Sequence, residues 1–313
     1  DKISLFCNID RASVIESIDA PTIYEVPFNM LREGLDIQVL KKLGISAKGE
    51  PDLEKWKSFL YRLKNPLTEV NIGLVGKYVE LKDAYKSISE AFIHAGAATQ
   101  CKVKIKWIHS EKLEDNPDCI QEELQGLNGI LVAPGFGSRG IEGKIMAVRY
   151  ARENKIPFLG ICLGMQCAVI EFARNVLGYK DAHSVEMSAS TTHPVIDIME
   201  EQKLIQNMGG TMRLGAYPCK LKENTKIYSA YQKENISERH RHRYEFNNAY
   251  LEAFEQAGMI ASGINPDTNL VEVVEIPSHP YFVGVQYHPE YRSTVVEPSP
   301  LFISFVKAAS RKE

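Results

Sequence analysis

Short apolar runs alternate with amphipathic segments along most of the chain after Thr68. The runs "LNGILVAPG" (127–135) and "IPFLGICLG" (156–164) are almost continuously apolar, which is typical of parallel strands buried on both faces. This alternation predicts an α/β fold: a doubly wound, mostly parallel sheet with helices on both faces. The same patterns predict strands at 69–76 and 102–109, helices at 83–98 and 142–155, and an antiparallel hairpin formed by 270–277 and 281–288.

The first 68 residues follow a different pattern. Residues 2–9 are predicted to form a strand, and residues 27–45 a short helical segment. Residues 46–66 combine a polar turn, an amphipathic helix around Trp56 and an Asn-Pro stop, which indicates a connector.

These patterns divide the chain into three parts. We expect the remnant of another domain at 1–45, a linker at 46–68 and the main domain at 69–313. The chain begins inside a predicted strand, without an initiator Met or a signal-peptide pattern, so we expect it to be a fragment of a longer protein.

Composition narrows the classes of function. The 313 residues are 44% hydrophobic and 25% charged, as in an ordinary globular protein, and the net charge of −3 argues against a nucleic-acid partner. No apolar run approaches the roughly 18 residues that a membrane helix needs. Six scattered cysteines without a C-x-x-C pair predict reduced thiols and a cytoplasmic location.

The motif "GICLG" (160–164) places Cys162 between two glycines at the end of a predicted strand and the start of a predicted helix. A nucleophile elbow has this form, because the sharp turn leaves no room for a Cβ on either side of the reactive residue. The helix N-terminus also favours the thiolate. A buried structural cysteine at a tight corner is the alternative, so the choice depends on whether a base lies nearby.

His288 is the candidate base. It ends a predicted strand and precedes Pro289 and Glu290, and the proline favours an extended conformation. In extended chain, residues two apart project to the same side, so Glu290 can orient the His288 ring. Cys162, His288 and Glu290 then follow the logic of a nucleophile–base–orienter triad. On its own, the H-P-E sequence favours a solvated turn; paired with the elbow at a strand end, it favours the triad.

Two further segments carry candidate chemistry. The glycine-rich turn "APGFGSRG" (133–140) follows a predicted buried strand and can direct backbone N–H groups at a developing oxyanion. It does not have the spacing of a P-loop or of a dinucleotide fingerprint. The basic run "ERHRHRYE" (238–245) is either a solvated face or an anion site that binds a substrate carboxylate.

Together, "PFLGICLGMQ" and "QYHPE" resemble class I glutamine amidotransferases, which release ammonia from glutamine with a Cys–His–Glu triad. The segments "GKYVELKDAYKSISEA", "GGTMRLG" (209–215) and "RHRHRYEFNN" (239–248) are similar to the CTP synthase branch of that family. The segment that begins "KISLFCNIDRASVIES" is similar to the end of that branch's synthetase domain. The resemblance therefore assigns residues 1–45 to a synthetase remnant.

The resemblance implies roles for individual residues. Cys162 corresponds to the nucleophile, His288 to the base and Glu290 to the orienting carboxylate. The other matched positions surround the glutamine: Glu186 faces its α-amino group, Arg243 its α-carboxylate, and Gln166 and Phe136 complete the site.

One position departs from the family pattern. The family usually has P-G-G-F-G where this chain has "APGFG" (133–137), so Pro134 replaces a glycine and cannot donate an N–H. We therefore expect the oxyanion donors to be Gly135 and Leu163.

The resemblance also implies partners. The full-length family enzyme aminates UTP to CTP with ATP, Mg²⁺ and glutamine, responds to GTP and forms a homotetramer; for this chain alone it implies a glutaminase with no cofactor or metal of its own. A γ-glutamyl hydrolase of the same fold and a catalytically silent regulatory module are the two alternatives.

Overall fold

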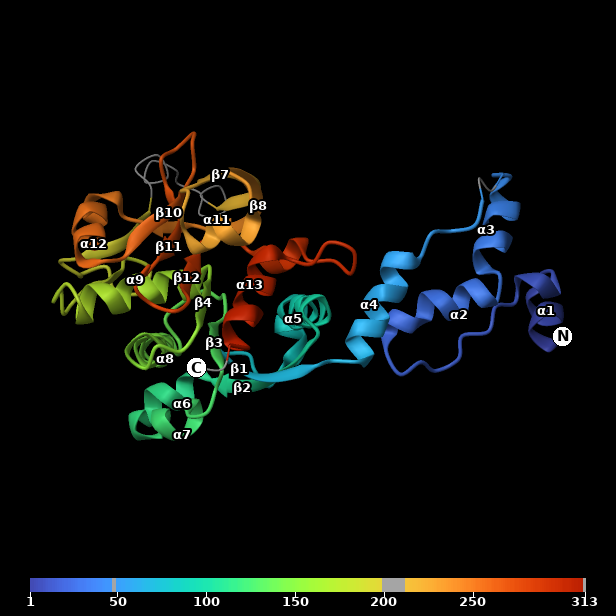
Figure 1. The fold of residues 1–313 in the computed structure, drawn as a ribbon, viewed down its shortest axis with the longest axis horizontal. Coiled ribbons are helices and arrows are strands. Elements are labelled where there is room, and N and C mark those ends of the chain that lie inside the picture. Colours follow the sequence, from blue (N-terminus) through green and yellow to red (C-terminus); the bar gives the residue numbers. More distant parts are fainter. Residues whose placement is uncertain (47–48, 199–211, 312–313) are drawn as a thin grey trace. The chain divides into compact units, whose positions relative to one another are not determined.

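The computed structural model describes residues 1–46, 49–198 and 212–311. It divides the chain into two units, Asp1–Lys64 and Asn65–Glu313, which are described separately (Figure 1). The boundary after Lys64 lies inside the predicted linker.

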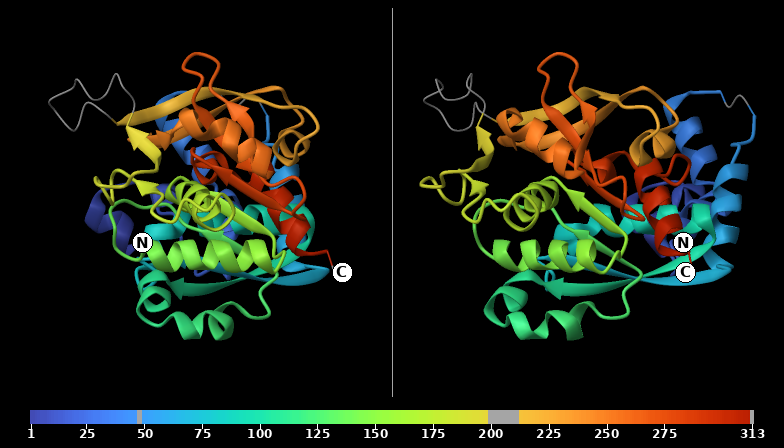
Figure 2. Two further views of the ribbon diagram at one scale, coloured as in Figure 1. Left: turned by 90° about the vertical axis from the view of Figure 1, so that its left-hand side faces the viewer. Right: turned by 60° about the vertical axis from the view of Figure 1, so that its left-hand side comes forward.

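A twisted sheet forms the centre of the second unit (Figure 2). Its strand order within the described residues is β2-β1-β3-β4-β12-β11-β10-β7-β8. The strands from β2 to β12 are parallel to their neighbours, and those from β12 to β8 are antiparallel. The predicted parallel strands and the hairpin of β11 and β12 are confirmed. The strands are β1 (Thr68–Gly76), β2 (Cys101–His109), β3 (Gly129–Val132), β4 (Phe158–Ile161), β7 (Arg213–Leu221), β8 (Asn235–His242), β10 (Ile260–Ile264), β11 (Val271–Glu275) and β12 (Phe282–Val285).

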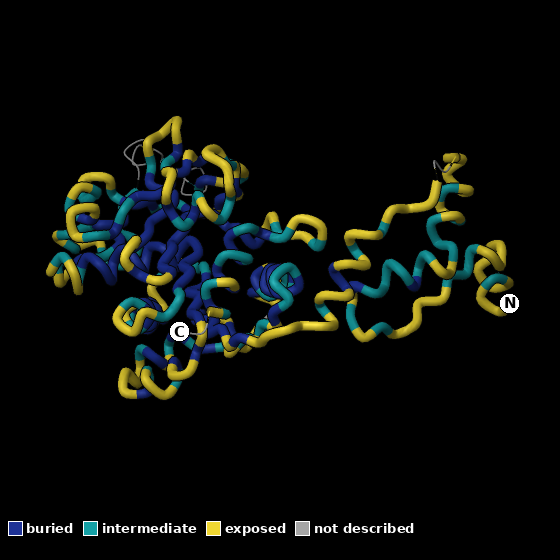
Figure 3. The backbone as a smooth tube through the Cα atoms, in the orientation of Figure 1, coloured by how far each residue is buried: buried dark blue, intermediate teal, exposed yellow. Residues whose placement is uncertain are grey.

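Helices cover both faces of the sheet. On one face α5 (Lys86–Thr99) packs beside α13 (Pro300–Ala309), and on the other α8 (Ile141–Glu153) packs beside α9 (Leu163–Asn175). In β3, Ile130 and Val132 belong to the core beneath α8 and α9, whereas Leu131 belongs to the core beneath α5 and α13. This two-sided burial explains why the sequence of β3 is continuously apolar (Figure 3).

Shorter elements complete the second unit. A small sheet has the order β5-β6-β9. None of the helices in the described ranges is both long and apolar enough to cross a lipid bilayer. The remaining elements are η3 (Lys82–Tyr85), α6 (Ser110–Asp115), η4 (Pro117–Cys119), α7 (Ile120–Leu124), β5 (His183–Ser184), β6 (Pro194–Ile198), α11 (Lys226–Tyr231), β9 (Tyr244–Phe246), η6 (Asn248–Tyr250), α12 (Leu251–Ala257) and η7 (Pro289–Arg292).

Every regular secondary-structure element in the described part of the first unit is a helix. The strand predicted at 2–9 is wrong: these residues form α1 (Lys2–Cys7), because the unit offers no neighbouring strand and a helix satisfies backbone groups locally. The helical segment predicted at 27–45 is two helices, separated at Gly34 with its φ of 71°. The elements are α1, η1 (Arg11–Ser13), η2 (Ile23–Glu25), α2 (Val26–Arg32), α3 (Leu35–Leu43) and α4 (Glu54–Lys64).

Helix α4 lies within the predicted linker but is part of this first unit. The Trp56 Nε1 donates to the Tyr24 carbonyl at 2.8 Å, and the Phe59 and Tyr24 ring centroids are 4.9 Å apart. Apolar residues three and four positions apart, such as Trp56, Phe59 and Leu60, give α4 a face to bury. The predicted linker therefore contains a helix that packs against the rest of the first unit.

Candidate active site

Cys162 lies at the corner between β4 and α9. Its φ of 54° and ψ of −106° are uncommon for a residue other than glycine. The corner is held by hydrogen bonds from the Cys162 N–H to the Val285 carbonyl at 2.7 Å and from the Gln166 N–H to the Cys162 carbonyl at 3.2 Å. A strained residue between strand and helix has the geometry of a nucleophile elbow.

The two glycines beside Cys162 have the steric role expected from the sequence. A Cβ on Gly160 would lie 2.7 Å from the carbonyl carbon of Gly164. A Cβ on Gly164 would overlap the carbonyl oxygen of Val132 on β3. Only glycine lets α9 start this close to β3 and β4.

His288 and Glu290 are paired side by side. The His288 Nδ1 is 2.7 Å from the Glu290 Oε1, and both side chains are buried. The backbone differs from the expectation: β12 ends at Val285, and Glu290 lies in the 3-10 turn η7. The His288 N–H donates to the Arg239 carbonyl at 2.8 Å, and its ring stacks on Tyr291 with centroids 5.0 Å apart.

The electrostatic surroundings of His288 favour its protonated form. Burial lowers the pKa of His288, but the Glu290 carboxylate and the hydrogen bond and charge of Cys162 outweigh burial and raise it well above the usual value. The Nε2 has no partner among the described oxygen and nitrogen atoms. His288 therefore couples electrostatically to Glu290 on one side and to the Cys162 sulfur on the other.

Gly135 and Leu163 are brought together at the neighbouring ends of β3 and β4. A Cβ on Gly135 would lie 3.5 Å from the Leu163 Cδ2. In the described part of the chain, neither backbone N–H donates to a protein acceptor. Both N–H groups can therefore donate hydrogen bonds to a developing oxyanion.

The residues predicted to contact glutamine lie on several different segments. The Gln166 Nε2 donates to the Tyr244 carbonyl at 2.9 Å, and the Glu186 Oε1 accepts from the Gly137 N–H at 2.9 Å. Phe136 is 41% exposed and has the Arg241 guanidinium carbon 5.8 Å from its ring centroid. Arg243 lies between β8 and β9, directly before Tyr244.

The basic run has two different faces on β8. Arg239 and Arg241 are exposed, whereas His240 and His242 are buried. His240 lies 3.0 Å from Glu272, and His242 lies 2.8 Å from Glu245. The expectation of a solvated or anion-binding face therefore fits only the arginines.

The segment 209–215 is only partly described. Residues 209–211 lie outside the described residues, and Arg213 begins β7. The Arg213 guanidinium donates to both Glu245 and Glu272 at 2.8 Å, and all three side chains are buried. The end of this segment is thus anchored in the same ion-pair network as the histidines of β8.

Comparison with protein families decides the assignment. Residues 80–308 match the family described as glutamine amidotransferase class-I, and residues 1–45 match the CTP synthase N-terminus. The chain belongs to the class-I glutamine amidotransferases.

CTP synthases are among the most similar relatives of this amidotransferase chain. It is 65% identical to the CTP synthase of Cytophaga hutchinsonii, over 99% of this chain and 57% of that protein, and 64% identical to that of Flavobacterium psychrophilum, over 98% and 57%. It therefore spans little more than half the length of these relatives. The solved glutaminase domain of Trypanosoma brucei CTPS with bound acivicin is 41% identical, with a TM-score of 0.73 over 78% of this chain and 95% of that domain.

Sequence reasoning missed one residue at the amidotransferase nucleophile. The Gln286 Nε2 donates to the Cys162 Sγ at 3.6 Å, and its Oε1 accepts from the Gln166 Nε2 at 3.2 Å. Gln286 is fully buried. Its signal in the sequence is a single polar residue within the apolar run "YFVGVQYH".

The described residues contain no group of three or more His, Cys, Asp or Glu side chains placed to hold a metal ion. The chemistry that this site can perform is nucleophilic attack by a thiolate with proton transfer by His288.

Proposed function

We propose that this chain is the glutaminase part of a CTP synthase and hydrolyses L-glutamine to glutamate and ammonia. The observation that carries the proposal is the buried pair of His288 and Glu290, coupled to Cys162 at a strained strand–helix corner. The family membership supports the same substrate class.

In the proposed first step, the Cys162 thiolate attacks the amide carbon of glutamine. The N–H groups of Gly135 and Leu163 stabilise the oxyanion, and the proton on His288 passes to the leaving nitrogen, which departs as ammonia. The carbon–sulfur bond forms in the attack, and the carbon–nitrogen bond breaks when the oxyanion collapses to a γ-glutamyl thioester. Water, deprotonated by His288, then cleaves the thioester and regenerates the thiolate.

The substrate contacts are assigned on the family resemblance. We propose that Arg243 pairs with the α-carboxylate, that Glu186 faces the α-amino group and that Gln166 and Phe136 line the site. Glu186 already fixes the turn through the Gly137 N–H, which supports its place beside the substrate.

We further propose the domain assignment predicted from the sequence: a synthetase portion at 1–45, a linker at 46–68 and the amidotransferase domain at 69–313. In the full-length protein the ammonia would aminate UTP in the synthetase domain, with ATP and Mg²⁺. The surface of the first unit supports this partner, because Leu5 is 81% and Phe6 87% exposed. A groove of 910 Å³, lined by residues that include Phe28, Leu31 and Leu40, also suits burial by the rest of that domain.

Three proposals about the full-length protein rest on the resemblance alone or on cysteine chemistry. They are activation by GTP near Phe136, a homotetramer, and a cytoplasmic location, where a catalytic thiol stays reduced.

The experiment that tests the proposed function is ammonia release from glutamine by the wild-type chain and by Cys162→Ala. Wild-type activity that disappears in Cys162→Ala supports the proposal, and unchanged release by that variant contradicts it. A γ-glutamyl peptide, tested in parallel, separates a glutaminase from a γ-glutamyl hydrolase, since the proposal predicts that glutamine is hydrolysed faster.

A further inference from the structure

Lys144 is a fully buried lysine that the proposed mechanism leaves unused. It lies in the first turn of α8, and its Nζ donates to the Ala133 carbonyl at 2.7 Å. Within the described ranges, this carbonyl is the one hydrogen-bond acceptor of the ammonium, and no carboxylate forms an ion pair with it. Burying an ammonium without a carboxylate is costly, so a contribution to function would explain its position.

The ammonium lies next to the proposed oxyanion donor. Ala133 directly precedes Pro134 and Gly135. A Cβ on Gly135 would lie 3.7 Å from the Lys144 Nζ and 3.5 Å from both the Lys77 Cε and the Leu163 Cδ2. The Gly135 backbone is therefore surrounded by two lysine side chains and the first residue of α9.

Lys77 holds the other side of the same turn. Its Nζ donates to the Phe136 carbonyl, and the next N–H, that of Gly137, donates to Glu186 at 2.9 Å. The carbonyls on both sides of Gly135 thus accept from buried lysines. Pro134 has no N–H, and the two lysines hold the turn through its carbonyl oxygens.

The groups that face Lys144 define what its charge can act on. They are the thiols of Cys167 and Cys162 and the ammonium of Lys77. The pKa of Lys144 is lowered to about 8, mainly by burial. Cys167 and Cys162 raise this pKa by smaller amounts, and the charge of Lys77 lowers it further. Burial also raises the pKa of Cys167 to about 12, so that group stays a neutral thiol near pH 7. The thiolate of Cys162 and the oxyanion that forms on it are the negative charges left for Lys144 to stabilise.

We propose that Lys144 is a positioning residue for glutamine hydrolysis: its ammonium fixes the Ala133 carbonyl, aims the Gly135 N–H at the oxyanion and stabilises the charge that develops there. This inference rests on the proposed glutaminase function and adds a residue that acts through the turn.

The test is Lys144→Met in the full 313-residue chain, since methionine is unbranched and apolar and removes both the charge and the donor. Loss of one oxyanion-stabilising group lowers kcat by about 100-fold, so we expect a fall of about 10- to 100-fold here. The KM for glutamine should change less than about threefold, because the affected interaction is made in the transition state.

The pH dependence of kcat is a second test. The kcat of the wild type should decline as the pH rises above about 8, because Lys144 then loses its proton. Lys144→Met should not show this decline.

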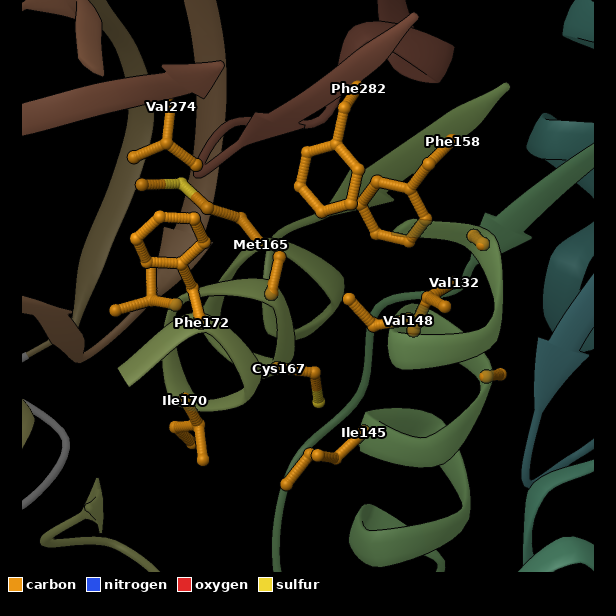
Figure 4. Close-up of a cluster of buried hydrophobic side chains, with 14 of the residues drawn as sticks. Val132, Ile145, Val148, Phe158, Met165, Cys167, Ile170, Phe172, Val274 and Phe282 are labelled. Carbon is orange, nitrogen blue, oxygen red and sulfur yellow. The ribbon is translucent and has the colours of Figure 1, made fainter. Parts of the chain in front are cut away.

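Cys167→Ala is the matched control. Cys167 belongs to the core between α8 and α9, and the close-up shows it beside Ile145 of α8 (Figure 4). This variant opens a small space near Lys144 but keeps its ammonium, so we expect kcat within about twofold of wild type.

A folded Lys144→Met with wild-type kcat, or with the wild-type decline above pH 8, overturns the inference. If that variant does not fold, Lys144→Leu gives the same comparison with a shorter apolar side chain. If the wild-type protein releases no ammonia, the proposed function itself is overturned. If the wild-type protein and Lys144→Met are equally active, only the inference about Lys144 is overturned.

Discussion

The side-chain amide of Gln286 donates a hydrogen bond to the sulfur of Cys162 at 3.6 Å. The same amide is fixed at its oxygen by Gln166, which in turn donates to the backbone of Tyr244. This chain of three polar groups orients a donor at the nucleophile from the side of β12. An N–H that points at a thiolate stabilises the charged, reactive form.

Substitution of Gln286 by Leu removes that donor and keeps a side chain of similar size. A hydrogen bond to a charged group contributes about 1.5 kcal/mol, so we expect alkylation of Cys162 by iodoacetamide at pH 7 to slow by roughly tenfold. The rate is followed on the Cys162 peptide by mass spectrometry. Gln256→Leu, on the exposed face of α12, is the control and should leave the rate unchanged. An equal rate in Gln286→Leu would show that the contact does not stabilise the thiolate.

Glu290→Gln should impair catalysis without removing His288. The side-chain amide of the new glutamine can donate to the His288 Nδ1, which favours the tautomer with the proton on Nε2. In this tautomer the Nε2 cannot accept a proton from water. We expect kcat for ammonia release to fall by about 100-fold or more. Glu297→Gln, an exposed carboxylate a few residues later, is the matched control. Near-wild-type kcat in Glu290→Gln would argue against the orienting role of Glu290.

Gly164→Ala should destabilise the fold severely. Its methyl group would overlap the Val132 carbonyl, so β3 and α9 must separate, and we expect a loss of about 3 kcal/mol or more in the free energy of unfolding. Gly126→Ala is the comparison: its φ of 75° is unfavourable for alanine, but no atom lies within 4 Å of the new methyl group. That variant should lose only about 1 kcal/mol. Similar losses in urea unfolding of the two variants would contradict the steric argument.

Glu238→Gln should stabilise the protein above neutral pH. Burial raises the pKa of Glu238 to about 7, and the Tyr231 hydroxyl donates to its Oε1 at 2.9 Å. Below about pH 4.5 this carboxyl is protonated in both the folded and the unfolded chain, so it adds no pH dependence there. Between about pH 4.5 and 7 the unfolded chain loses the proton first, so stability falls as pH rises.

The glutamine side chain in Glu238→Gln cannot ionise, so the stability of this variant does not decrease with pH for this reason. Its Tm advantage over wild type should grow from pH 5 to pH 8, by an amount that corresponds to roughly 2 kcal/mol. Thermal unfolding at both pH values measures it. An advantage that is constant over this range would contradict the assigned pKa of Glu238.

The sequence predicts the parallel half of the sheet well, because strands such as β3 and β4 are buried on both faces and carry an unbroken apolar signal. It misses β7, which begins with the buried Arg213, and β8, whose buried residues Glu238, His240 and His242 are all polar or charged. His240 and Arg213 are buried because both pair with Glu272 of β11, and such pairing depends on residues far apart in the chain. The strand predicted at 2–9 fails for the opposite reason, since apolar spacing cannot form a strand without a partner.

In the candidate site too, some residues can be predicted from the sequence and others cannot. Cys162 and His288 stand in short motifs with local signals, so the sequence identifies them. Lys77 and Lys144 look like ordinary surface residues in the sequence, and only the approach of β1 and α8 to one turn gives them their positions. Their role as anchors follows from three-dimensional proximity.

The central claim is that Cys162 attacks the amide carbon of glutamine. Peptide mass spectrometry after incubation of the folded chain with diazo-oxo-norleucine, a glutamine-directed electrophile, tests it most directly. We expect one adduct, on Cys162, which glutamine suppresses and which forms more slowly in His288→Ala. Folded protein that carries no adduct on Cys162, or an adduct on another cysteine that glutamine suppresses, would contradict it.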